Sequence, residues 1–256
     1  MKLRWFGTAA ISYTQNDQTI IFDPFCGWNK NLGCFTHREL ATQGDIFITH
    51  GHFDHLADVP LILAQNNAVV YCSQPTADVL ISQGVPPERV KVVKPGQVLT
   101  VGYFHVRVYQ GKHISFDRKL ILRTLFNIRL LHYFVSFIRI LKINRKFPES
   151  QTLIYVIEAG GKRIMHMGSL NLADGEVYPQ DLDILALPFQ GRSDLEAYAL
   201  SFVEKIRPKT IYLHHFDDTF PPVSSSVETG IFIRNSENDF PSIKFIVPKR
   251  GEAINI

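Results

Sequence analysis

Four metal-binding side chains are grouped at the junction of a predicted strand and a predicted helix. The segment ITHGHFDHLAD contains the pattern His-x-His-x-Asp-His at His50, His52, Asp54 and His55. The apolar run DIFIT precedes it, and a helical stretch at residues 58–65 follows. Because residues two apart on an extended chain point to the same side, His50 and His52 can bind one metal, while the turn carries the other two toward a second. Imidazole and carboxylate donors suit Zn, Fe, Mn and Ni, so the pattern predicts a transition-metal site.

The remaining strand and helix signals alternate along the chain. The first residues read as a meander of short strands in RWFG, ISYTQ and TIIFDPF. Further strands are expected in LTVGYFHVRVYQGKH, TLIYVIEAGGKRIMHMG, DILALPF and TIYLHHF, with helices over PTADVLISQG and LEAYALSFVEKIRP. This order predicts two mixed sheets packed together with helices outside, in a four-layer α/β sandwich. The length of 256 residues fits a single domain over residues 1–256 with one insertion.

The insertion, at about residues 116–149, is strongly basic. From Arg118 to Lys146 it holds eight Lys or Arg and no Asp or Glu, so the net charge of +3 leaves −5 for the rest of the chain. Polar residues recur at positions 129, 132, 136, 139, 142 and 146, in steps of three and four that mark a helix face. Leucine, isoleucine and phenylalanine fill the opposite side. The segment predicts a cationic amphipathic helix, and its charges exclude a transmembrane span.

Three roles fit such a helix at residues 118–146. It can act as a cap whose apolar side packs on the core or on a second subunit. It can contact an anionic membrane surface or bind a lipid-like substrate. Contact with nucleic acid is the third and less favoured role, since it rests on charge alone.

The chain resembles the metallo-β-lactamase superfamily, and in particular the ascorbate-6-phosphate lactonase-like hydrolases. The resemblance rests on the His-x-His-x-Asp-His segment and on TIIFDPF, QGKH and LHHFDDTFPP, and it covers nearly the whole chain apart from the insertion. It implies an αββα fold and a hydrolase that uses metal-activated water. It also implies two ligand sets, which are His50, His52 and His113 for one ion and Asp54, His55 and His215 for the other.

One position departs from the family's pattern. Where the family commonly has Gly-Asp, this chain reads IMHMGSLN, with Ser169 in place of the bridging carboxylate. A serine hydroxyl is a poor neutral ligand. Asp174, five residues further on, would have to swing in to replace it, although metal ligands must lie within tenths of an ångström of ideal positions. We therefore expect one or two divalent ions, with Zn favoured and Mn, Fe or Ni as alternatives.

Supporting roles follow from the same resemblance. Asp23 matches the residue that buttresses the metal site, and the His-aromatic-Asp pattern aligns His215, not His214, with the ligand. His166 and His214 lie within three residues of proposed site positions, where a histidine can orient a ligand. If only the first ion is bound, Asp54 is free to act as general base and His215 as general acid.

Three functional hypotheses remain open on these grounds. The first is hydrolysis of a lactone, ester or phosphoester in a small-molecule or lipid-like substrate. The second is a nucleic-acid phosphodiesterase of the same fold, and the third is a non-catalytic metal-binding module, because Ser169 weakens the site. Three cysteines without metal-like spacing and an N-terminus without a signal-peptide apolar run predict the cytoplasm, with peripheral membrane attachment if the insertion contacts lipid.

Overall fold

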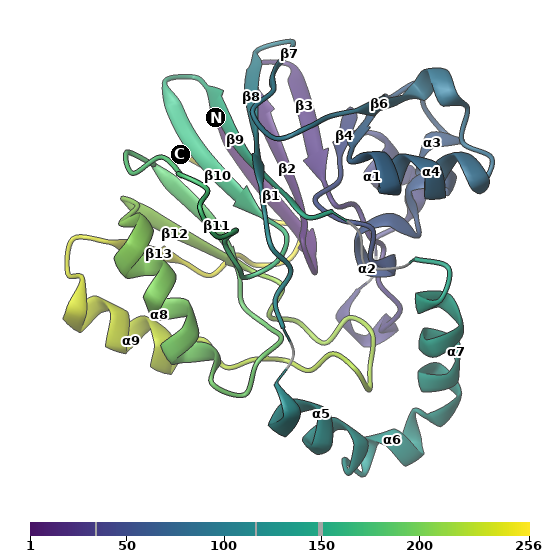
Figure 1. Ribbon diagram of the computed structural model, residues 1–256, viewed down its shortest axis with the longest axis vertical. Helices are drawn as coiled ribbons and strands as arrows, with labels where there is room; N and C mark the ends of the chain where they lie inside the picture. The colour runs from purple at the N-terminus through teal and green to yellow at the C-terminus, as the bar shows by residue number, and fades with distance from the viewer. Residues whose placement is uncertain (34, 116, 148–150) are drawn as a thin grey trace.

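The structure, a computed structural model, describes residues 1–33, 35–115, 117–147 and 151–256. Cys34 and positions 116, 148 and 149 of the predicted insertion lie outside the described residues. In the described part of the chain, two seven-stranded sheets face each other and helices cover their outer faces (Figure 1). This arrangement confirms the predicted four-layer α/β sandwich.

The first sheet contains the motif-bearing strand β4 and has the order β14-β1-β2-β3-β4-β5-β6. Strands β1 to β3 form the predicted antiparallel meander, whereas β3 to β6 are parallel. Helices on its outer face bury a cluster of apolar side chains against the sheet. The elements of this half are β1 (Lys2–Gly7), β2 (Ala10–Gln15), β3 (Gln18–Phe22), a 3-10 turn (Lys30–Leu32), α1 (His37–Ala41), β4 (Asp45–Phe47), α2 (Phe53–Leu56), α3 (Val59–Leu63), β5 (Val70–Cys72), α4 (Gln74–Ser82), a 3-10 turn (Pro87–Arg89), β6 (Val90–Val92) and β14 (Ala253–Asn255).

The second sheet has the order β13-β12-β11-β10-β9-β8-β7 and carries α8 and α9 on its outer face (Figure 1). The β9–β10 hairpin turns through Gly160 and Gly161, whose φ values of 56° and 71° suit a two-residue loop. Its elements are β7 (Val98–Val101), β8 (Phe104–Gln110), β9 (Leu153–Ala159), β10 (Lys162–Met167), β11 (Ile184–Pro188), α8 (Leu195–Ile206), β12 (Thr210–His214), α9 (Gly230–Asp239) and β13 (Lys244–Ile246).

The two sheets are joined at the segment that carries the histidine motif. A third apolar cluster fills the space between the sheets, where alternate residues of each strand point inward. The Tyr155 hydroxyl of β9 donates a hydrogen bond to the Ile48 carbonyl (2.8 Å), and the Leu153 N–H donates to the Thr49 carbonyl (2.7 Å). The chain just before His50 is therefore fixed by both sheets.

The insertion is not the single continuous helix that its periodicity predicts. It forms three helices, α5 (Arg118–Leu125), α6 (Arg129–His132) and α7 (Phe134–Asn144), arranged as an arc beside the edge of the sandwich (Figure 1). The Asn127 side chain accepts a hydrogen bond from the Arg129 N–H (2.9 Å), which starts a new helix there. Tyr133 has φ −105° and ψ 24°, outside helical values, and separates α6 from α7. A periodicity argument does not detect these local breaks.

Candidate metal centre

Two parallel strands deliver Asp23 and Thr49 to the same edge of the first sheet. Asp23 follows β3 with a left-handed φ of 45°, and its N–H donates to the Phe47 carbonyl at the end of β4 (2.9 Å). Its fully buried carboxylate accepts the Thr49 N–H (2.7 Å) and the Thr49 hydroxyl (2.6 Å). These hydrogen bonds fix the backbone that leads into the motif.

The same network sets the proton position on His50. An ionised Asp23 only accepts hydrogen bonds, so the Thr49 hydroxyl must donate to it. The Thr49 oxygen is then left to accept from Nδ1 of His50, which lies 3.0 Å away. The Nε2 atom of His50 consequently keeps its lone pair, which is the form a metal ion requires.

The structure brings His50, His52 and His113 together. One ring nitrogen from each lies within 4.8 Å of the others. His52 comes immediately before α2, and His113 lies between β8 and α5, where the Asn171 amide donates to the His113 carbonyl (3.1 Å). Burial and the neighbouring imidazoles hold the pKa of His50 well below its ordinary value and lower the pKa of His113 to about 4. The His50 and His113 rings are therefore neutral at pH 7 and offer lone pairs.

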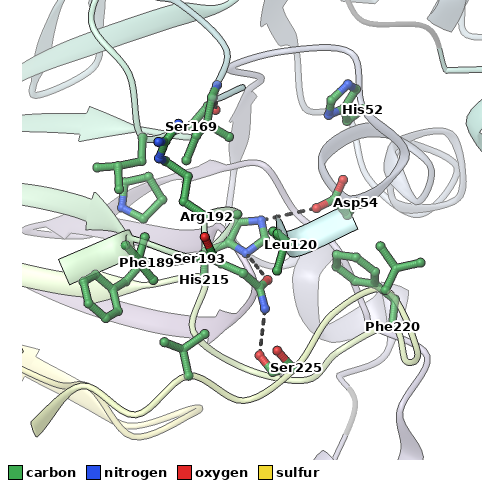
Figure 2. A pocket seen from close by; sticks show the side chains of 18 of the residues that line it. His52, Asp54, Leu120, Ser169, Phe189, Arg192, Ser193, His215, Phe220 and Ser225 are labelled. Atoms are coloured by element: carbon green, nitrogen blue, oxygen red, sulfur yellow. Dashed lines mark hydrogen bonds and ion pairs between the residues drawn. The ribbon is translucent and has the colours of Figure 1, made fainter. Parts of the chain in front are cut away.

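A second group consists of Asp54, His55 and His215, whose donor atoms also lie within 4.8 Å of one another. One Asp54 oxygen lies 3.3 Å from Nε2 of His215 (Figure 2). The same oxygen lies 3.6 Å from Nε2 of His55. Burial opposes ionisation of Asp54, but the charge on His55 and a hydrogen bond from His215 hold its pKa below the ordinary value. Nδ1 of His55 lies 2.9 Å from the Asp23 carboxylate, which leaves Nε2 of His55 facing Asp54.

Gln190 orients His215, a role that the sequence did not reveal. The Gln190 amide nitrogen donates to the Ser225 carbonyl (2.7 Å), and its amide oxygen lies 3.1 Å from Nδ1 of His215 (Figure 2). This geometry places a proton on Nδ1 and directs Nε2 toward Asp54. The only sequence signal for Gln190 was its place in the loop PFQG, directly after an apolar strand.

Ser169 lines the same cavity as the two groups and holds a neighbouring loop. Its hydroxyl accepts the Ile114 N–H (2.9 Å) and so holds the loop that carries His113. The preceding Gly168 is packed so closely that an added Cβ would lie 1.9 Å from the Thr49 hydroxyl oxygen. Asp174, which would have to swing in to replace the missing carboxylate, has an exposed side chain paired with Lys112 (2.8 Å) and does not line the cavity.

His166 and His214 lie behind the two groups rather than in them. His166 is fully buried, with Nδ1 2.8 Å from the Tyr13 hydroxyl and Nε2 3.9 Å from the Asp23 carboxylate. Its ring stacks on the buried His214 ring, with centroids 5.5 Å apart. His166 contacts the site through Asp23, and His215 rather than His214 lines the cavity.

A third set of metal-type donors, Cys26, His37 and Asp58, lies outside this site. The Asp58 carboxylate accepts the Cys26 N–H (2.8 Å) and lies 3.1 Å from Nε2 of His37. These contacts tie the loop after β3 to the start of α3. We interpret this cluster as structural.

All six predicted ligands line one cavity of about 1380 Å³. The insertion forms part of its wall through Leu120, Ile140 and Asn144. Arg192 and Phe220 also line it, on either side of His215 (Figure 2). Trp28 does not line the cavity. It stacks on Phe53, with ring centroids 5.1 Å apart, and the Arg139 guanidinium lies 4.7 Å from its ring centroid, so it anchors α7.

Comparison with known proteins agrees with this architecture. Residues 2–215 match the family described as "Beta-lactamase superfamily domain". A "UPF0173 metal-dependent hydrolase" of Polynucleobacter asymbioticus is 26% identical over 267 residues, covering 99% of this chain and 85% of the relative. A protein of the same description from Ruegeria is 27% identical over 259 residues, covering 97% of each chain.

Solved structures show the same fold. Igni18, a metallo hydrolase from Ignicoccus hospitalis, superposes with a TM-score of 0.66 at 18% identity and covers 99% of this chain and 97% of its own. The relatives named above carry no lactonase name, so the narrower resemblance to ascorbate-6-phosphate lactonases stays a prediction. The family match over residues 2–215 establishes that this chain belongs to the beta-lactamase superfamily and is a metal-dependent hydrolase with the metallo-β-lactamase fold.

Proposed function

We propose that this enzyme binds one divalent ion, preferably zinc, at each of two triads. We propose further that it hydrolyses a lactone, ester or phosphoester of an amphiphilic small molecule. The first triad is His50, His52 and His113, and the second is Asp54, His55 and His215. The observation that carries the proposal is the convergence of these six side chains in one cavity beneath the insertion.

The donor chemistry of both triads fits the proposed ions. Catalytic zinc sites take three protein ligands and keep one coordination position for water or substrate. The Thr49 hydroxyl orients His50, the Asp23 carboxylate orients His55 and the Gln190 amide orients His215. Such supporting hydrogen bonds fix which nitrogen faces a metal. A bridging carboxylate at Ser169 is therefore not needed to complete either triad.

A divalent ion bound here lowers the pKa of water to roughly 7 and polarises the bond to be cleaved. The chain's own contribution is to position the ligands, and to provide a carboxylate and an imidazole in contact. Asp54 and His215 are 3.3 Å apart at the cavity wall. If the second triad is empty, this contact supports the alternative in which Asp54 accepts the proton of the attacking water and His215 protonates the leaving group.

The cavity lining supports an amphiphilic substrate. Leu120, Ile140 and Phe220 provide apolar wall, while Asn127 and Arg192 provide hydrogen-bond donors. Ligand cavities of this kind bury apolar groups and use a few polar side chains to fix orientation. A substrate with an acyl or alkyl portion and a polar or anionic head fits this division.

A panel of acyl-lactones, p-nitrophenyl acyl esters and p-nitrophenyl phosphodiesters, assayed with the zinc-loaded full chain, tests the proposal. We expect kcat/KM to rise with acyl length in at least one series, since each methylene buried in the apolar wall stabilises the complex by about 0.8 kcal/mol. Single-stranded RNA and DNA belong in the same panel. Hydrolysis of nucleic acid alone would identify the phosphodiesterase instead, and no turnover by the metal-loaded protein would identify a non-catalytic module.

A further inference from the structure

The outer side of the insertion exposes an unusual number of large apolar side chains. Each is more than half exposed. We call these six residues the outer cap surface: Leu122, Phe126, Ile128, Leu131, Phe134 and Val135. They fall within 14 consecutive residues, on α5, α6 and α7 and in the turn between α5 and α6, which form the arc beside the sandwich (Figure 1). Soluble monomers rarely leave such a group uncovered, so a clustered patch marks an interaction site.

The inner side of the same helices is already packed. Arg129 forms an ion pair with Asp218. Arg139 lies over the ring of Trp28. Ile140 and Phe147 are buried in the core cluster beneath the first sheet. The rest of the chain therefore packs against the inner side of these helices and leaves the outer cap surface uncovered.

Positive charge surrounds the outer cap surface. Besides Arg139, which lies over Trp28, five described basic side chains of the insertion are exposed, namely Arg118, Lys119, Lys142, Arg145 and Lys146. No Asp or Glu occurs between residues 118 and 146, although the rest of the chain is net negative. The charge is therefore concentrated around the apolar side chains, which makes this end of the molecule attractive to an anionic surface.

We propose that the outer cap surface docks on an anionic lipid bilayer, with its apolar side chains in the headgroup region and the flanking cations on lipid phosphates. Apolar side chains flanked by Lys and Arg are the composition of helices that lie in the membrane interface. None of the described helices has the length and apolarity needed to cross a bilayer, which fits attachment parallel to the surface.

The charge pattern argues against the other occupants. A second copy that used the same patch would set the exposed cations of residues 118–146 against the same cations, and neither copy has an Asp or Glu within that stretch. Nucleic acid phosphates would pair with the cations. They would also lie against the apolar side chains of Phe126, Leu131 and Val135, whose contact with phosphate is not stabilising. A bilayer of anionic lipid can bury the apolar side chains and pair its phosphates with the flanking Lys and Arg side chains.

The helices that carry this surface also line the cavity. Leu120 on α5 and Ile140 on α7 face the cavity, whereas Leu122 and Val135 on the same two helices are exposed outside. Docking would therefore place the bilayer against the outer side of the cavity wall. This placement suits an amphiphilic substrate, although the docking itself does not depend on the proposed hydrolysis.

Flotation of the full chain with vesicles tests the docking directly. We expect it to float with vesicles of phosphatidylglycerol and phosphatidylcholine at low salt, and not with phosphatidylcholine alone. The L131D/V135D variant should stay in the bottom fraction. The K142E/R145E variant should bind at least about tenfold more weakly, because each basic residue near an anionic leaflet contributes on the order of 1 kcal/mol.

Matched controls use exposed residues elsewhere in the fold. Val177→Asp places the same charge on a side chain 85% exposed, and Lys91→Glu reverses an exposed charge on β6. Both should float like wild type, and all variants should keep wild-type circular dichroism and metal content. Failure of wild type to float, or unchanged flotation of L131D/V135D, would overturn the proposal. Tighter binding to DNA than to anionic vesicles would assign the surface to nucleic acid and overturn it as well.

Discussion

Replacing His52 with alanine should remove the ion from the first triad and lower kcat/KM on the order of a thousandfold. Loss of the ion removes several kcal/mol of transition-state stabilisation, and each 1.36 kcal/mol corresponds to about a factor of ten in rate. His52 is only half-buried, whereas His50 in the same triad is buried, so removal of the His52 side chain should leave the fold intact. Steady-state kinetics on the best substrate of the panel, with metal analysis of the same sample, provide the measurement.

The control for this variant is His105→Ala. His105 is an exposed histidine on β8 whose ring contacts Thr100 and does not line the cavity. Its removal should change neither metal content nor kcat/KM by more than about twofold, since surface substitutions far from a site and from the core have small effects. Full activity in His52→Ala would contradict a role for the first triad.

Replacing Asp23 with alanine should destabilise the protein by about 3–5 kcal/mol, because removal of one partner of a buried charged pair leaves the other uncompensated. The carboxylate is fully buried and contacts the Thr49 N–H, the Thr49 hydroxyl and Nδ1 of His55. Burial opposes its ionisation, but the charge of His55 and hydrogen bonds from His166 and His55 hold the pKa of Asp23 below its ordinary value. Urea denaturation of the metal-free protein measures the free energy of unfolding without the contribution of bound ions.

Asp174→Ala is the matched control for Asp23→Ala. Its side chain is 91% exposed and pairs with Lys112 at the surface. Exposed ion pairs contribute about 0–1 kcal/mol, so this variant should unfold within that margin of wild type. Equal destabilisation by the two substitutions would show that Asp23 does not support the site as described.

The architecture could be predicted because each strand is marked by its own local pattern of apolar and turn residues. Alternating burial along β8 and the glycine pair of the β9–β10 hairpin are local properties, readable without a structure. The ligands were predictable for a different reason. His50, His52, Asp54 and His55 share one short segment, and the family resemblance supplied the distant partners.

Contacts that depend on tertiary structure were not predictable. Gln190 reaches His215 only because β11 and β12 are neighbours in the second sheet, and no motif marks such a pair. The breaks at Asn127 and Tyr133 escaped the periodicity argument because a helical repeat continues through them in sequence. Ser169 could be recognised as a departure from the family, but its actual partner, the Ile114 N–H, required the fold.

The metal-to-protein ratio of the zinc-loaded full chain, measured by elemental analysis on wild type and on Ser169→Asp, tests the two-triad centre most directly. Our account predicts two ions per chain in both proteins, because each triad already provides three donors. A ratio of one in wild type that rises to two in Ser169→Asp would contradict it and would support the alternative in which Asp54 and His215 transfer protons beside a single ion. Protein that binds no metal would contradict the metal centre itself.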